Sequence, residues 1–202
     1  TADLVALTTD QVAALGSRQV SALGTAQVSV LKTSQIVVLT SDQVGALTTG
    51  QIVALTTGQV SQLTTDQLVA LNSRQVSSLE TADVAALTTA QAVALTSDQM
   101  AVLTTAQVVA LKTSQIEALE SDQLNALNSR QIAAIETADL VALTTDQVAA
   151  LGSRQLSALG TAQISVLKTS QLVVLTSDQI SALSAGQIVA LTTGQVSQLT
   201  TD

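Results

Sequence analysis

Glutamine is the one polar residue type that recurs at a fixed spacing along this chain, at every eighth position. Twenty-two glutamines share this register, from Gln11 to Gln195, and aspartate replaces glutamine at Asp3, Asp83 and Asp139. A row of amides could bind a repetitive ligand such as a surface glycan. We favour the alternative, in which each glutamine caps the start of a helix or bonds to the same glutamine of the next coil.

The three aspartates raise the question of a metal site, because carboxylates are calcium ligands. Calcium takes about six to eight oxygen ligands, whereas Asp3, Asp83 and Asp139 are single acids separated by 80 and 56 residues. We therefore expect no metal site and no cofactor, with aspartate acting as a substitute cap acceptor.

Threonine pairs such as Thr8-Thr9 could form a flat hydroxyl array, but Gly, Lys, Glu or Asn often interrupts it.

No residue set points to catalysis. The chain has no His and no Cys, Lys occurs only three times, and Gly appears singly rather than in a phosphate-binding loop. We therefore expect no enzymatic activity and no catalytic or cofactor-binding residues.

The net charge of −8 argues against a nucleic-acid partner. No apolar run approaches the roughly 18 residues of a membrane span, so we expect no membrane insertion.

The glutamines belong to an eight-residue repeat, Leu-x-Ser/Thr-x-Gln-Val/Ile-x-x-Leu, which occurs about twenty-five times. We label its positions a to h, with Leu7 at a. Position c is Ser or Thr except at Ala185, e is Gln apart from the three aspartates, f is usually Val, Ile or Leu, and h is mostly Ala. All charged residues fall at b, d, e and g. We therefore expect a, f and h to form the core, and b, d and g to face water or a neighbouring chain.

The spacing favours helices. Position f and the following a are three residues apart, which places them on one face of a helix. In a continuous helix, eight residues at about 100° each would turn the apolar stripe by about 80° per repeat. Each octad should instead be a short helix, roughly from d to the next a, followed by a bend. The sequence thus predicts an all-α solenoid; the β-branched content favours the alternative, a β-solenoid with a Ser/Thr ladder.

The bend is expected at b and c. Ser and Thr are good N-caps, and Thr8 with Gln11 forms a capping-box pattern if b is the cap. Position b also carries glycines such as Gly16, which tolerate the left-handed conformation that often follows a helix. We place the turn at b and the cap at c, although the pattern leaves the choice between b and c open.

The repeat runs through residues 1–202 as a single uninterrupted array, and no linker or domain boundary is evident. Residues 1–66 return as 137–202 with few changes, mainly apolar exchanges at f such as Val20 for Leu156. A weaker echo of seven octads joins Arg18, Arg74 and Arg130. We expect the chain to be a window of a longer array.

Two resemblances follow from these residues. The stretch Leu7–Val12 resembles the opening of a transcription-activator-like effector repeat, but the likeness ends after about eight residues, and DNA recognition is not carried over. The whole chain resembles the Leu-Thr-Thr-x-Gln-Val-x-Ala-Leu octapeptide tracts of very large secreted or surface proteins of bacteria. That resemblance implies an adhesin, stalk or filament context and an extracellular or cell-surface location.

Two functions are consistent with the sequence. The array is either a structural segment, such as a spacer or a filament component, or a binding module for a periodic ligand such as a surface glycan. The variable b, d and g positions and the absence of aromatic residues favour the structural class.

Self-association, lateral or end to end, is expected because valine recurs at g. These valines are Val5, Val37, Val53, Val69, Val93, Val109, Val141, Val173 and Val189.

Overall fold

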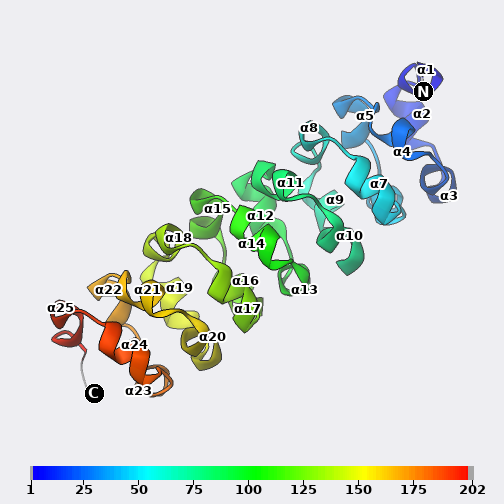
Figure 1. Cartoon of the computed structure of the whole chain (residues 1–202). Coiled ribbons are helices and arrows are strands. Elements are labelled where there is room, and N and C mark those ends of the chain that lie inside the picture. The colour runs from blue at the N-terminus through cyan, green and yellow to red at the C-terminus, as the bar shows by residue number, and fades with distance from the viewer. Residues whose placement is uncertain (1, 200–202) are drawn as a thin grey trace. The chain divides into compact units, whose positions relative to one another are not determined.

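The computed structural model describes residues 2–199, and every regular element in that range is a helix of four to six residues (Figure 1). No described residue forms a strand, so the predicted all-α repeat solenoid is confirmed and the β-solenoid alternative is wrong. The helices are α1 Ala2–Val5, α2 Thr9–Ala13, α3 Ser17–Ser21, α4 Thr25–Val28, α5 Thr33–Val37, α6 Ser41–Gly45, α7 Thr49–Ala54, α8 Thr57–Val60, α9 Thr65–Val69, α10 Ser73–Ser78, α11 Thr81–Ala86, α12 Thr89–Ala94, α13 Ser97–Val102, α14 Thr105–Ala110, α15 Thr113–Ala118, α16 Ser121–Ala126, α17 Ser129–Ala134, α18 Thr137–Ala142, α19 Thr145–Ala150, α20 Ser153–Ala158, α21 Thr161–Ser165, α22 Thr169–Leu172, α23 Ser177–Ser181, α24 Ala185–Ala190 and α25 Thr193–Val196.

Position b, not c, is the helix cap. In α7 the N-cap Thr48 is extended, with φ −72° and ψ 158°, and the helix begins at c, Thr49. It ends at h, Ala54, and Leu55 at a is extended again, with φ −61° and ψ 137°. The predicted span from d to the next a is therefore wrong at both ends. The reason is spacing: only b lies three residues before the glutamine, as a reciprocal capping box requires.

The link between helices consists of extended residues rather than a left-handed turn. The b-position Gly16 has φ −71° and ψ 151°, and no described glycine has a positive φ. The left-handed conformation predicted for these glycines is therefore wrong. A Cβ at Gly16 would meet its nearest neighbour at an ordinary 3.5 Å, which agrees with the variety of residues at b.

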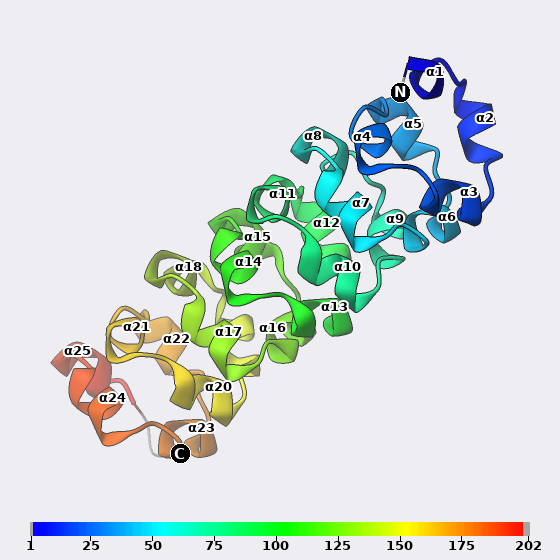
Figure 2. The same cartoon turned by 45° about the vertical axis from the view of Figure 1, so that its right-hand side comes forward.

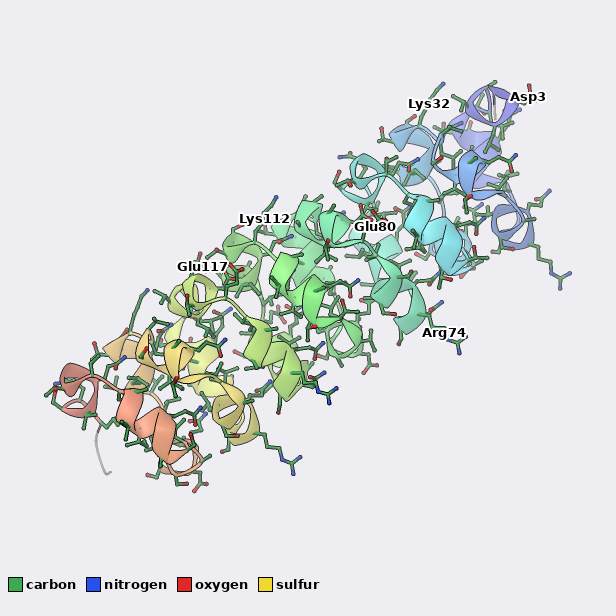
Figure 3. The ribbon with its side chains drawn as sticks, viewed as in Figure 1. Asp3, Lys32, Arg74, Glu80, Lys112 and Glu117 are labelled. Carbon is green, nitrogen blue, oxygen red and sulfur yellow. The ribbon has the colours of Figure 1, made fainter. Side chains whose placement is uncertain are left out.

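The core consists of positions e, f and a. In α7, Gln51 and Ile52 are buried, as is the following Leu55, while Ala54 at h is only half-buried. The predicted core of a, f and h is thus correct for a and f, and wrong in omitting e. Positions b and d face solvent as predicted, and Figure 3 shows Lys32, Arg74 and Lys112 projecting away from the ribbon.

One coil comprises about three and a half octads. Helices three octads apart pack against each other, as α7 does on α4 and α10 on α7 (Figure 2). Glutamines, in contrast, reach the helix four octads earlier: Gln59 donates to the carbonyl of Val28, 31 residues before it. The seven-octad echo between Arg18 and Arg74 therefore corresponds to two coils. It returns the same side chain to the same side of the stack.

The chain divides into two compact units, Thr1–Val102 and Leu103–Asp202. The first contains α1 to α13 and the second α14 to α25. Both units bury the same octad positions, and in each the helices follow one another around successive coils.

Candidate functional site

Each glutamine at e closes the start of its own helix. The Oε1 atom of Gln59 accepts a hydrogen bond from the backbone N–H of Thr56 at 2.7 Å, and the Thr56 hydroxyl accepts from the N–H of Gln59 at 3.3 Å. Where b is glycine, the glutamine bond is the only side-chain cap, as between the N–H of Gly16 and Gln19 at 2.7 Å. Asparagine at b replaces the hydroxyl, since Asn72 accepts from the N–H of Gln75 at 3.1 Å. The predicted capping role of glutamine is confirmed.

The other end of the same amide joins two coils. Nε2 of Gln59 donates to the carbonyls of Val28 and Leu31 at 3.0 and 2.7 Å. These carbonyls belong to the end of α4 and the link after it, where helical hydrogen bonds run out. The predicted partner, the glutamine of the next coil, is therefore wrong, because the amide donor meets backbone carbonyls instead.

Burial makes this ladder energetically important. Gln59 is 2% exposed, and its amide is satisfied at both ends. Removing a buried hydrogen-bond partner costs about 1–3 kcal/mol for each group left unsatisfied. Because the contact recurs within each unit, these glutamines form a coil-to-coil ladder there, which we call the glutamine ladder. Its members from Gln35 onward are the buried glutamines of the chain.

The first glutamines lie outside this ladder. Gln11 and Gln19 are exposed, and their Oε1 atoms accept the capping bonds from Thr8 and Gly16. Among the described residues, no carbonyl accepts from their amide nitrogens. They therefore cap helices without joining coils, which separates the two roles of glutamine within one molecule.

Aspartate at e follows the glutamine pattern only in part. Asp83 and Asp139 are buried, at 1% and 4% exposure, whereas Asp3 is exposed. The backbone N–H of Glu80 donates to the Asp83 carboxylate, which supports the predicted role as a cap acceptor. Burial raises the pKa of Asp83 above its ordinary value, and the charge of Glu80 adds to that effect. Within the described range, no three acidic side chains gather into a group that could hold a metal ion.

The Ser/Thr hydroxyls at b are engaged in helix caps, and some at c contact the next coil. At b they accept capping bonds, as Thr48 does from the N–H of Gln51 at 3.2 Å. At c, Ser129 donates to the carbonyl of Arg154 on the next coil at 3.4 Å. The hydroxyl array considered from the sequence therefore has its b members oriented toward the backbone.

The interior offers little space for a ligand. The enclosed gap in the first unit, lined by leucines, valines and an isoleucine, has a volume of about 10 Å³, at the lower limit for one water molecule. A surface hollow of about 440 Å³ lies in the second unit, between the starts of α17 and α20, and Asn128, Ser129 and Arg154 are among the residues that line it.

No helix in the described part of the chain is long and apolar enough to cross a membrane.

The pattern of apolar residues did not predict that the side chains at position e are buried, although the sequence carries a signal for this burial. Exposed positions b and d vary widely, whereas e is Gln in every octad except those of the three aspartates. Such constancy at a polar position indicates a fixed set of partners. The identity of those partners could not be predicted, because they lie 28 to 31 residues away and the eight-residue pattern describes only neighbouring residues.

These features define a class of protein, an α-helical repeat solenoid whose coils are joined by buried amides. The chain belongs to the ALTTAQ repeat family, whose six-letter motif stands complete at Ala86–Gln91. The family matches residues 1–33, 25–57, 49–80, 76–113, 109–135, 132–169, 148–185 and 166–201. This tiling confirms the predicted tandem repeat tract and supports a structural repeat segment. No curated protein matches the chain.

Proposed function

We propose that this repeat tract is a stalk, spacer or self-assembling filament component of a large bacterial extracellular protein, and that it catalyses no reaction. The observation that carries this proposal is the glutamine ladder. Every buried polar side chain of the described residues is a glutamine or an aspartate at position e, and the buried glutamines bond coil to coil. A chain that commits its buried polar groups to its own repeat contacts suits a structural role.

Self-assembly is supported by apolar side chains left on the surface. Val37 and Val69 are 40% and 44% exposed, and they stand four octads apart, so they lie on neighbouring coils of the first unit. In the second unit Val109 and Val173 are exposed at 43% and 46%, with the half-buried Val141 midway between them in sequence. Exposed apolar side chains favour contact with a partner, and a second copy of the array is the partner proposed here.

Electron microscopy of the purified chain tests the proposal. We expect fibres or bundles, in which copies join laterally or end to end. Dispersed single particles at every protein concentration would contradict the filament role and leave the spacer role. A saturable turnover that one point substitution abolishes would contradict the structural proposal as a whole.

The extracellular and bacterial placement rests on the resemblance to octapeptide tracts of surface proteins. Protease treatment of intact cells that produce the parent protein tests it. We expect the repeat tract to be cleaved on intact cells. Cleavage only after lysis would contradict a surface location.

A second candidate function is binding of a surface glycan. The surface hollow between α17 and α20 favours it, because Asn128, Ser129 and Arg154 supply polar groups there. A glycan array probed with the chain and with Arg154→Ala distinguishes the two functions. Saturable binding that the substitution weakens would favour the glycan-binding role, and absence of binding would favour the structural one.

A further inference from the structure

Asp83 stands where most octads have the bridging glutamine, yet it lacks the donor that bridging requires. Its side chain is 1% exposed, and its Oδ2 atom has no hydrogen-bond partner. The carboxylate accepts from the N–H of Glu80 and from the hydroxyl of Thr57 on α8. One end of the glutamine contact is thus preserved, and the coil-to-coil end is incomplete.

The carbonyls that a bridging amide would serve here are identified by the ladder itself. Glutamines donate to carbonyls 31 and 28 residues earlier, as Gln59 does to Val28 and Leu31. For position 83 these are the carbonyls of Ile52, at the α7 position of Val28 in α4, and of Leu55. The carbonyl of Leu55 accepts no hydrogen bond from any described residue. An ionised carboxylate and a carbonyl both accept and neither donates, so no bond can join them.

We propose that Asp83 is a proton-binding site of the array, at which the neutral carboxylic acid donates its O–H to the carbonyl of Leu55, the carbonyl after α7 that a ladder glutamine would serve. The proton comes from solvent and sits on Oδ2, and no other bond is made or broken except this hydrogen bond. The other carboxyl oxygen keeps the bonds from Glu80 and Thr57. Protonation of Asp83 then supplies the missing contact of the ladder within the first unit.

The charges around Asp83 are few. Helix α8, which packs against α11, carries no titratable side chain, and neither does α7. Along the chain, α12 has none and α10 has only Arg74, which is exposed. Glu80, in the same octad, is the acid whose charge opposes ionisation of Asp83. Burial is the larger cause of the raised pKa, and the hydrogen bonds from Thr57 and Glu80 only partly offset it.

The direction of the pH effect follows from these causes. In the unfolded chain Asp83 titrates near its ordinary pKa of 3.8, and in the folded chain its pKa lies higher. The folded state therefore binds the proton more tightly, so protonation stabilises the fold. This contribution is complete below the unfolded pKa and is lost as the pH rises through the folded pKa.

The test compares the full chain with its Asp83→Asn variant, whose amide supplies an N–H donor at every pH. Carboxyl carbon NMR, with the Asp83 signal identified by its loss in the variant, should give a pKa above 3.8. Thermal unfolding from pH 3 to pH 8 should show a higher Tm for the variant at neutral pH. That difference should shrink as the pH falls and Asp83 gains its proton.

Two controls make the outcome decisive. Asp98→Asn removes an exposed acid from α13. The difference in Tm between this variant and the unsubstituted chain should not change with pH as Asp83 titrates. Asp83→Gln restores the ladder residue and gives a second comparison if the asparagine variant does not fold. A pKa of Asp83 at or below its ordinary value would overturn the proposal. Added sodium or calcium that stabilises the unsubstituted chain but not Asp83→Asn would also overturn the proposal. A cation would then occupy the place assigned to the proton.

Discussion

Glutamine suits position e because its planar amide carries an acceptor and two donors on a long, flexible stem. Glutamate, in contrast, has no donor for the carbonyls of the preceding coil when it is ionised. The capping half of this role was predictable, because cap and glutamine are three residues apart in Thr8 and Gln11. The bridging half was not, since the partners of Gln59 lie 28 and 31 residues away.

The assignment of b as the cap predicts unequal effects for two adjacent threonines. Thr48→Ala removes the hydroxyl that accepts from the N–H of Gln51 and should lower the free energy of unfolding by about 1 kcal/mol. Thr49→Ala, at the exposed first helical position, should change it by less than about 0.5 kcal/mol. Chemical denaturation of both variants checks this, and a larger loss for Thr49→Ala would contradict the assignment.

At the scale of the element, helices of four to six residues cannot persist alone, because nucleation costs more than so few hydrogen bonds return. Their stability comes from packing f and a between coils. The sequence predicted helices correctly, because f and the next a are three residues apart. It placed their ends wrongly, since leucine at a looks like a helix residue yet packs inward from an extended link, as Leu55 does.

Two neighbouring apolar residues of α7 test this packing. Ile52 is fully buried and Val53 is 45% exposed. Ile52→Ala should lower the free energy of unfolding by about 2–5 kcal/mol, whereas Val53→Ala should lower it by less than about 1 kcal/mol. Equal losses in equilibrium unfolding would show that the f position is not the core.

At the scale of the whole chain, most octads repeat the same coil-to-coil contact of a buried glutamine. The repeat and its all-α class were predictable from the sequence, because the period is read directly. The size of the coil was not, because about three and a half octads per coil depends on how tightly α4, α7 and α10 pack. The echo joining Arg18 and Arg74 gains its meaning only once two coils are known to span seven octads.

Self-association should respond to salt. The net charge of −8 repels neighbouring copies, and a Debye length of about 8 Å at physiological ionic strength weakens that repulsion. Sedimentation of the full chain should therefore show larger assemblies at high salt than at low salt. Val37→Asp with Val69→Asp should reduce assembly, whereas Thr49→Asp, which adds charge at an exposed polar position, should reduce it less. A monomer at every salt concentration would rule out the proposed self-assembly.

Equilibrium unfolding of Gln59→Ala beside Gln19→Ala tests most directly whether the glutamine ladder holds the coils together. Both variants lose a capping bond of similar length, 2.7 Å in each case. Only Gln59 also joins α8 to the carbonyls of Val28 and Leu31. We expect Gln59→Ala to lower the free energy of unfolding by about 2–4 kcal/mol, because it removes the capping bond and leaves the buried carbonyl of Leu31 without a donor. We expect Gln19→Ala to lower it by about 1 kcal/mol or less. Equal losses in the two variants would contradict the ladder as the source of coil-to-coil stability.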